Sequence, residues 1–426
     1  MKQAKRVVIV GGGWAGCAAA VSAVKCGLET ILLERTDLLL GTGLVGGIMR
    51  NNGRLAAQEE CCALGASELF RITDANSRHR NINFPGHRHA SLYDIVKTPA
   101  EVERYLKQIG VRIEYRARIQ KAQVLCGVLH SVTDGRGRVF PADVFIDTTG
   151  SAGPQVNCTK YGNGCAMCVL RCPSFGGRVS LTALAGIREI QGRNALGGIG
   201  AMSGSCKLMK ESLSPAITQK LNRTGVVVLP LPKELIEDHL AKKACQQYAL
   251  PEYRENLILL DTGHAKLMAP FFNLEKLRQV PGFENARFVD PYAGGHGNSV
   301  RFLAMAPRND ALLVTGTKNL FCAGEKAGPM VGHTEAIITG SLAGYNASRL
   351  AYGQPPLILP RKLACGEAIS YVREQMGTPR GLTMKYTFSG SVLLDRIKQL
   401  RFDGTDAAQI HARVDSLGLT GVFRKM

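Results

Sequence analysis

The sequence reads Val7-Val8-Ile9-Val10-Gly11-Gly12-Gly13-Trp14-Ala15-Gly16 at the point that decides the fold. The four β-branched residues are typical of a buried strand in a parallel sheet. The six residues after them satisfy the pattern G-x-G-x-x-G, and the Ala-rich segment 17–25 predicts a helix. A second strand, residues 30–33, ends at Glu34, which lies 18 residues after Gly16. Strand, glycine turn, helix, strand and acid in this order predict a dinucleotide-binding βαβ unit.

Each conspicuous residue of this unit has a physical role in such a site. Gly11 permits the tight turn, Gly13 lets the backbone approach a pyrophosphate, and Gly16 lets the helix pack closely on the strand. The helix N-terminus offers N–H groups to the pyrophosphate, and Glu34 accepts hydrogen bonds from ribose hydroxyls. The cofactor contacts predicted here are Gly11, Gly12, Gly13, Ala15, Gly16, Glu34 and Arg35.

A second glycine loop near the other end of the chain points to a flavin. Residues 319–325 read as a strand that ends in the pair Gly324-Glu325, and a further loop opens onto a helix that starts near His333. Loop amides and a helix dipole there would stabilise negative charge on a reduced flavin. We therefore predict FAD as the cofactor. The further contacts expected are Gly46, Gly47, Thr149, Gly150, Gly324, Glu325, Gly332, His333 and Thr334.

These motifs resemble those of the glutathione-reductase-type FAD oxidoreductases. The segments 319–325, 333–336, 340–349, 353–356 and 359–361 are more closely similar to the group that holds the glucose-inhibited division protein A family and the folate- and FAD-dependent tRNA uracil-methyltransferase family. The resemblance covers residues 5–150 and 285–365. It implies a Rossmann-like fold, an FAD cofactor and, for the second family, tRNA and folate as partners.

One departure from the methyltransferase family concerns its nucleophile. That family has a reactive cysteine shortly after the second strand, whereas the matching residues 47–53 contain none. Cys61 and Cys62 follow about a dozen residues later, on a predicted helix over 55–70. The departure argues against methyl transfer to uracil by the family's route.

A cysteine cluster in the middle of the chain suggests a metal centre. Four cysteines fall within 15 residues: Cys158, Cys165, Cys168 and Cys172. The spacing C-x2-C-x3-C-P from Cys165 to Pro173 equals the last three cysteines of the bacterial ferredoxin run. A [4Fe–4S] cluster is our first interpretation, with Cys165, Cys168 and Cys172 as three ligands and Cys158 or Cys206 as the fourth. The alternatives are a redox-active dithiol Cys165/Cys168, a zinc site, and buried cysteines without a chemical role.

The basic charge is concentrated around these cysteines. The formal net charge is +19, and residues 157–224 hold nine basic and two acidic residues. Such a surface fits an anionic small molecule such as a folate, an acidic electron-transfer protein such as ferredoxin, or tRNA. A solvated surface without a partner is the remaining interpretation.

Three residues are candidates for a catalytic role. His296 lies in the polar, glycine-rich loop 290–298, where it could donate a proton near the flavin ring. His333 stands at the predicted helix start beside the flavin, and Cys168 belongs to the redox-active pair.

The predicted fold is α/β, a Rossmann-like FAD-binding domain with an inserted α+β substrate or cap domain and a small C-terminal helical region. We expect the FAD domain in residues 1–55, 95–155 and 310–360, and the cap in 56–94 and 156–309. Helices at 363–375, 393–400 and 407–417 are expected in the C-terminal region, 361–426. A hydrophobic content of 45% excludes a disordered chain, and no apolar run is long enough for a membrane span, so a cytoplasmic protein without membrane contact is expected.

The first functional hypothesis is an FAD-dependent oxidoreductase whose iron–sulfur cluster exchanges electrons with the flavin, acting on an anionic substrate or partner. The second is a folate- and FAD-dependent tRNA-modifying enzyme. The third is an electron-transfer flavoprotein subunit without a substrate of its own. The oligomeric state is not predicted.

Overall fold

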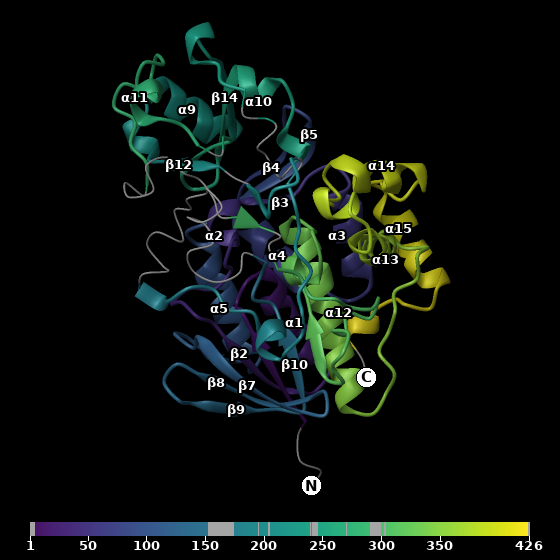
Figure 1. Cartoon of the computed structure of the whole chain (residues 1–426). Helices are drawn as coiled ribbons and strands as arrows, with labels where there is room; N and C mark the ends of the chain where they lie inside the picture. The colour runs from purple at the N-terminus through teal and green to yellow at the C-terminus, as the bar shows by residue number, and fades with distance from the viewer. Residues whose placement is uncertain are drawn as a thin grey trace.

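Figure 1 shows the fold of the chain in a computed structural model. The structure describes residues 5–151, 174–194, 196–202, 205–238, 240, 246–269, 271–289, 300–301 and 304–424. The predicted cluster cysteines Cys158, Cys165, Cys168 and Cys172, and His296, lie outside these residues.

A five-stranded parallel sheet forms the base of the molecule, in the order β17-β10-β1-β2-β6. Its strands are β1 (Arg6–Val10), β2 (Glu29–Leu33), β6 (Arg112–Glu114), β10 (Val144–Asp147) and β17 (Leu320–Cys322). Residues 7–10 are at most 3% exposed, because helices cover the sheet. The predicted strands at 7–10 and 30–33 are confirmed, and so is the α/β class with a parallel sheet.

Two helices of small residues pack closely over this sheet. They are α1 (Trp14–Lys25) and the long, almost entirely buried α12 (His333–Ala351). A Cβ atom at Gly340 would lie 2.2 Å from the Ala15 carbonyl oxygen, and one at Gly344 would lie 2.2 Å from that of Ala19. Only glycine permits this approach, which brings the N-termini of α1 and α12 close to each other above the sheet.

Further elements flank the sheet. Helix α5 (Thr98–Gln108) packs against α1, and the antiparallel sheet β7 (Ile119–Leu125), β8 (Val128–Asp134) and β9 (Val139–Pro141) closes the lower end in Figure 1. Three short elements lie near the edge of the parallel sheet where the carboxyl ends of its strands meet. They are α2 (Gly43–Gly46), α8 (Leu181–Leu184) and η6 (Gly324–Ala327).

The part of the chain that lies above the sheet in Figure 1 has its own hydrophobic core. Its antiparallel sheet has the order β12-β15-β14-β13, with strands β12 (Cys206–Leu208), β13 (Val226–Pro230), β14 (Asn256–Asp261) and β15 (Ala265–Leu267). Helices α9 (Pro215–Thr224), α10 (Glu252–Glu255) and α11 (Leu274–Leu277) and the turn η4 (Gln246–Tyr248) accompany it. The two-stranded pair β11 (Ala201–Met202) and β16 (Val300–Arg301) lies apart from this sheet. This upper part is called the cap below.

A small sheet joins the cap to the base. It consists of β3 (Ile48–Arg50), β5 (His87–Tyr93) and β4 (Ser77–Phe84), with β5 in the middle. Ile48, Phe84 and Leu92 share a core with Ile258 and Met268 of the cap. The cap is therefore fixed to the base by apolar packing.

Helical segments complete the molecule on the right of Figure 1. The predicted helices are confirmed as α13 (Ala364–Met376), α14 (Ser391–Gln399) and α15 (Ala407–Ser416), with short turns η7 (Gly381–Thr383) and η8 (Val422–Arg424). The single helix predicted over 55–70 is wrong, because α3 (Arg54–Ala63) and α4 (Glu68–Ala75) are separate. Gly65 adopts a φ of +106°, which a continuous helix does not permit.

Candidate functional site

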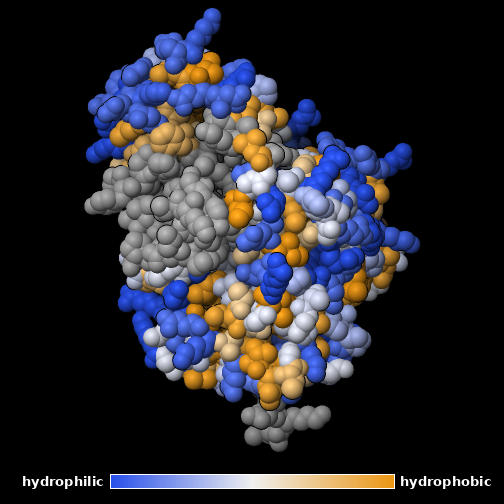
Figure 2. All heavy atoms as spheres, viewed as in Figure 1, coloured by the Kyte–Doolittle hydropathy of each residue, from blue (hydrophilic) through white to orange (hydrophobic). Residues whose placement is uncertain are grey.

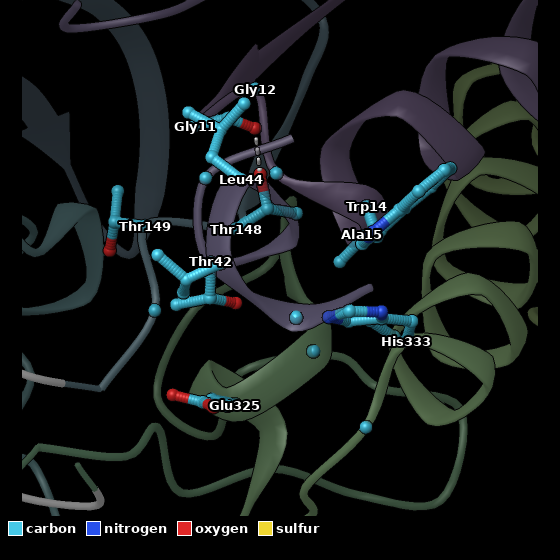
Figure 3. Close-up of a pocket in the computed structure, with 18 of the residues that line it drawn as sticks. Gly11, Gly12, Trp14, Ala15, Thr42, Leu44, Thr148, Thr149, Glu325 and His333 are labelled. Carbon is cyan, nitrogen blue, oxygen red and sulfur yellow. Dashed lines mark hydrogen bonds between the residues drawn. The ribbon is translucent and has the colours of Figure 1, made fainter. Parts of the chain in front are cut away.

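A cavity of about 230 Å³ lies at the carboxyl ends of the parallel strands. Val10, Leu33 and Thr148 line it from the ends of β1, β2 and β10. This edge is the usual ligand position in a parallel α/β sheet. In Figure 3, Thr149 lies across the cavity from Trp14 and His333.

The first glycine loop has the geometry that the sequence predicts. Gly11 has a φ of +109°, and a Cβ there would lie 2.5 Å from the Thr148 carbonyl oxygen. A Cβ at Gly16 would lie 1.9 Å from the Gly11 carbonyl oxygen, so helix and strand are in close contact. At Gly13, by contrast, a Cβ would meet nothing within 4 Å. The loop therefore leaves open space at the N-terminus of α1, where a phosphate group fits.

Glu34 is a buried acceptor at the end of β2. Its carboxylate accepts hydrogen bonds from the Gly12 amide (2.8 Å) and from the amide and hydroxyl of Thr36 (2.8 Å each). These bonds anchor the carboxylate at the cavity wall beside the glycine loop, where a ribose hydroxyl would reach it.

The turn Thr149-Gly150 is held by a buried carboxylate. Asp147 accepts bonds from the Thr149 amide (3.0 Å) and hydroxyl (2.7 Å), and from the amide and hydroxyl of Thr182 (2.7 Å each). Thr148 donates its hydroxyl to the Gly11 carbonyl at 2.6 Å, the dashed line in Figure 3. Strand β10 and the glycine loop thus form one rigid edge of the cavity.

The second glycine loop meets the cavity at the start of α12. A Cβ at Gly46 would lie 1.9 Å from His333 Cε1, so the imidazole occupies the space that a side chain at residue 46 would need. Gly332 is similarly crowded, since a Cβ there would lie 1.9 Å from Glu335 Oε2 and 2.2 Å from Arg54 Nη2. Both glycines keep the backbone close to the groups that shape this end of the cavity.

Two aromatic side chains pack around His333. The Trp14 and Tyr93 rings meet edge to face with centroids 5.7 Å apart, and the His333 ring lies 6.0 Å from Trp14 and 5.7 Å from Tyr93. The Tyr93 hydroxyl donates to the Gly43 carbonyl at 2.7 Å and lies 3.3 Å from His333 Nδ1. Burial raises the pKa of Tyr93 above its usual value, so the phenol stays protonated. These contacts fix the imidazole at the N-terminus of α12.

The cap contributes a wall that sequence reasoning missed. Its lining residues are Ser205, Gln247, Tyr248, Lys266 and Met268. Lys266 is 6% exposed, and its ammonium donates to the Val45 carbonyl and the Ser205 hydroxyl at 2.7 Å each. No motif marks these residues, because they come from different cap segments that only the fold brings together.

Most predicted cofactor residues line this cavity. They are Gly11, Gly12, Gly13, Ala15, Glu34, Arg35, Gly46, Thr149, Gly150, Gly324, Glu325, Gly332 and His333. Three predicted contacts do not line the cavity, although each adjoins a lining residue in the sequence. They are Gly16, Gly47 and Thr334. Gly16 packs on Gly11, and Thr334 donates its hydroxyl to the Met49 carbonyl at 2.7 Å.

Three of the cysteines that the structure describes are poor nucleophiles. On α3, burial raises the pKa of Cys61 well above its usual value and that of Cys62 to about 12. Burial also raises the pKa of Cys322 to about 12. Within the described part of the chain there is no group of three or more His, Cys, Asp or Glu residues placed to hold a metal ion. No helix in the same residues is long and apolar enough to cross a membrane.

These residues fit an FAD molecule. The open backbone at Gly13 and the N-terminus of α1 suit a pyrophosphate, the Glu34 carboxylate suits a ribose, and the space between His333 and the cap wall suits a flat ring. The predicted cofactor and the geometry of the cavity therefore agree.

Comparison with known proteins identifies the family. The profile of the family described as "Glucose inhibited division protein A" matches residues 6–251 and 263–355. A solved structure of GidA from Aquifex aeolicus, in its form II crystal, has a TM-score of 0.67 at 16% identity, covering 99% of this chain and 74% of that one.

Two curated relatives are methylenetetrahydrofolate–tRNA-(uracil-5-)-methyltransferases TrmFO. That of Lysinibacillus sphaericus is 35% identical over 102 residues, 24% of this chain and 22% of the relative. That of Solibacter usitatus is 38% identical over 96 residues, 22% and 21% of the two chains. The matched segments thus span about a fifth of the length of these relatives. The family profile covers most of this chain, which therefore belongs to the glucose inhibited division protein A family and is an FAD-dependent enzyme.

Proposed function

We propose that this enzyme modifies tRNA, with a folate as the donor of a one-carbon group. The proposal rests on the similarity to the TrmFO relatives, which are methylenetetrahydrofolate–tRNA-(uracil-5-)-methyltransferases, and on the extent of the family match. The family match includes the FAD-binding segments and also most of the cap, residues 205–251 and 263–289 among those described. A match to the cap supports a shared substrate class, since the cap supplies the wall of the cavity that faces the ring end of the cofactor.

A basic surface on the cap side supports an RNA partner. Exposed Arg80, Arg88 and His89 stand on the β4–β5 hairpin, and exposed Lys220 and Arg223 stand on α9. Gly225, at the end of α9, lies against the His79 ring, where a Cβ would be 2.6 Å from Cγ, so hairpin and helix are neighbours. Figure 2 shows many hydrophilic residues over the upper part of the molecule, which includes α9. Positive side chains spread over such a surface suit a phosphate backbone.

In this proposal the cofactor supplies the redox chemistry, and the residues of the chain bind the cofactor. FAD, when bound, accepts and delivers electrons, and the residues described above hold it and shield its ring. A thiolate on α3 would not serve as a nucleophile, because the raised pKa values keep Cys61 and Cys62 protonated at neutral pH. We therefore propose that the flavin takes part in the tRNA modification and that no cysteine of α3 acts as a nucleophile.

Binding and product analysis test this proposal. Bulk tRNA should bind with steep salt dependence, and Arg80→Gln with Arg88→Gln should weaken binding and reduce the slope by about one for each phosphate that the variant no longer neutralises. The control is Arg104→Gln, an exposed residue of α5 in the base. Nucleosides of tRNA from cells lacking the enzyme should lose one modification. Unchanged nucleosides, or binding that ignores Arg80 and Arg88, would contradict the proposal.

A second proposal concerns the cysteine run at 158–172. The ferredoxin-like spacing C-x2-C-x3-C-P favours a [4Fe–4S] cluster on Cys158, Cys165, Cys168 and Cys172 that exchanges electrons with the flavin and an acidic partner. Anaerobically purified protein should then contain iron and sulfide, which Cys165→Ser removes and Cys126→Ser, at an exposed cysteine, does not. Protein without iron and sulfide would exclude the cluster.

A further inference from the structure

Tyr93 decides which ring nitrogen of His333 carries the proton. Burial raises the pKa of Tyr93 above its usual value, so the hydroxyl keeps its single proton. It donates that proton to the Gly43 carbonyl oxygen at 2.7 Å, and a carbonyl oxygen can only accept. The Tyr93 oxygen is therefore the acceptor in its 3.3 Å contact with His333 Nδ1, as it is for the indole N–H of Trp14 at 3.4 Å. His333 Nδ1 is then a donor and carries a proton.

The other ring nitrogen, Nε2, lies beside Gly46 in the cavity wall. A Cβ at Gly46 would lie 1.9 Å from His333 Cε1 and 2.4 Å from Nε2, but 3.2 Å from Nδ1. Gly46 and His333 line the cavity, whereas Tyr93, to which Nδ1 is turned, does not. In Figure 3 the imidazole extends from the start of α12 toward the middle of the cavity. A neutral imidazole that donates from Nδ1 has its lone pair at Nε2, so Nε2 is the atom at which His333 accepts a proton.

The start of α12 favours the neutral form of this imidazole. His333 is the first residue of a 19-residue helix, and the N-terminus of a helix carries a partial positive charge. An imidazolium at this position is unfavourable as long as the cavity holds an uncharged ring. A negative charge on that ring would favour the protonated form instead, because an opposite charge nearby stabilises a charged group.

Charged side chains of four elements lie at this end of the cavity within the described residues. Arg54 of α3 and Glu335 of α12 form a buried ion pair at 3.1 Å. Lys266 of β15 adds a positive charge to the cavity wall, and Glu325 of η6 adds a negative one. These two positive and two negative charges leave no net charge beside His333. The charge of the molecule that fills the cavity therefore decides the protonation of the imidazole.

We propose that His333 takes up a proton at Nε2 when the bound FAD is reduced and releases it when the FAD is reoxidised. A hydride donor gives the flavin ring two electrons and one proton, which leaves the ring with one negative charge. Neutral His333 takes a second proton from solvent and becomes an imidazolium, so the net charge in the cavity does not change. On reoxidation the two electrons and one proton leave the ring, and His333 returns its proton to solvent. The inference does not depend on an RNA partner.

The first experiment counts the protons that are taken up on reduction. Protein loaded with FAD is reduced with dithionite, and the pH dependence of the midpoint potential between about pH 7 and pH 8 gives the number of protons. The wild type and the control His130→Gln, at an exposed histidine of β8, should take up two protons for each pair of electrons. His333→Gln should take up one. The absorption of the negatively charged reduced ring in all three proteins would place the second proton on the protein.

Two results of this experiment would overturn the proposal. One is an uptake of two protons by both the wild type and His333→Gln, which would assign the second proton to another group. The other is an uptake of one proton by the wild type, and this result needs no variant. The wild-type count therefore keeps its force even where His333→Gln fails to fold.

The second experiment observes the imidazole directly by NMR of full-length protein with 13C-labelled histidine. Among the nine histidines, one Cδ2 signal should change from the Nδ1–H tautomer to the imidazolium when the FAD is reduced. Tyr93→Phe removes the acceptor of the Nδ1 proton, so the same signal in the oxidised protein should shift toward a mixture of the two neutral tautomers. Absence of any signal that becomes an imidazolium on reduction would overturn the proposal. An unchanged tautomer in Tyr93→Phe would overturn the proton assignment on which it depends.

Discussion

Arg54 and Glu335 form a buried ion pair beside the end of the cavity that Gly332 and His333 line. Arg54 Nε lies 3.1 Å from each carboxylate oxygen, and the two side chains are 3% and 1% exposed. Glu335 also accepts bonds from the Thr387 hydroxyl at 2.7 Å and the Phe388 amide at 2.9 Å. The pair joins α3 and α12 to the segment before α14. It therefore holds together three segments that are far apart in the sequence.

Removal of one partner should destabilise the fold strongly. We expect Glu335→Ala to cost about 3–5 kcal/mol of unfolding free energy, because Arg54 would be left buried without its counter-charge. Urea unfolding measures this. The exposed pair Arg254–Glu255 supplies the control, where Glu255→Ala should leave the unfolding free energy nearly unchanged. A similar small cost for both variants would contradict the role assigned to the buried pair.

Gly46 should tolerate no side chain while His333 is present. In Gly46→Ala the new methyl group would overlap the imidazole, since its carbon would lie 1.9 Å from His333 Cε1. We expect this variant to retain little flavin, as measured by absorbance of the purified protein. His333→Ala removes the obstacle, so the double variant should recover flavin relative to Gly46→Ala. Absence of recovery would show that the backbone at Gly46, and not the imidazole, sets the restriction.

The cofactor half of the site could be read from the sequence because its determinants are local. Gly11, Gly13 and Gly16 act through backbone conformation within one turn, and Glu34 follows at a fixed spacing. The parallel strands and the C-terminal helices are likewise set by short-range patterns. Gly65 is the exception, since its positive φ divides what periodicity reads as one helix.

The cap wall could not be read in this way. Lys266 lies in the middle of an ordinary strand and Gln247 in a short turn, and neither has a neighbour in sequence that marks it. They reach the cavity because Met268, which follows β15, and Tyr248 of η4 pack in one apolar core with residues of β3 and β5, which lie far away in the chain. Such non-local packing carries no sequence signature that a single chain reveals.

Glu34 should contribute to FAD affinity beyond its role in the loop. We expect Glu34→Gln to weaken FAD binding about 10- to 100-fold, because hydrogen bonds to a charged acceptor contribute about 1.5–3 kcal/mol. Fluorescence titration of flavin-free protein measures the dissociation constant. Glu29→Gln, at the exposed start of the same strand, pairs with Arg6 and serves as the control. Equal FAD affinities of Glu34→Gln and Glu29→Gln would show that Glu34 does not bind the ribose.

His87 should make stability depend on pH in acid. Burial, helped by the Arg54 charge, lowers the pKa of His87 to about 3, whereas an unfolded histidine has a pKa of about 6.5. Below about pH 6.5 the unfolded chain gains a proton that the folded chain does not, so unfolding becomes easier as pH falls. The loss should approach about 1.4 kcal/mol per pH unit until about pH 3 and be absent above about pH 6.5.

Urea unfolding of the wild type and His87→Gln at several pH values isolates this contribution. The variant should be less stable near neutral pH, because the bonds to Asn51 and Gln247 are disturbed, but its stability should fall less steeply in acid. His411→Gln, at an exposed histidine of α15, is the matched control for the loss of one imidazole. Parallel pH profiles for the wild type and His87→Gln would mean that the imidazole takes up a proton in the folded protein, and the neutral link between Asn51 and Gln247 would have to be abandoned.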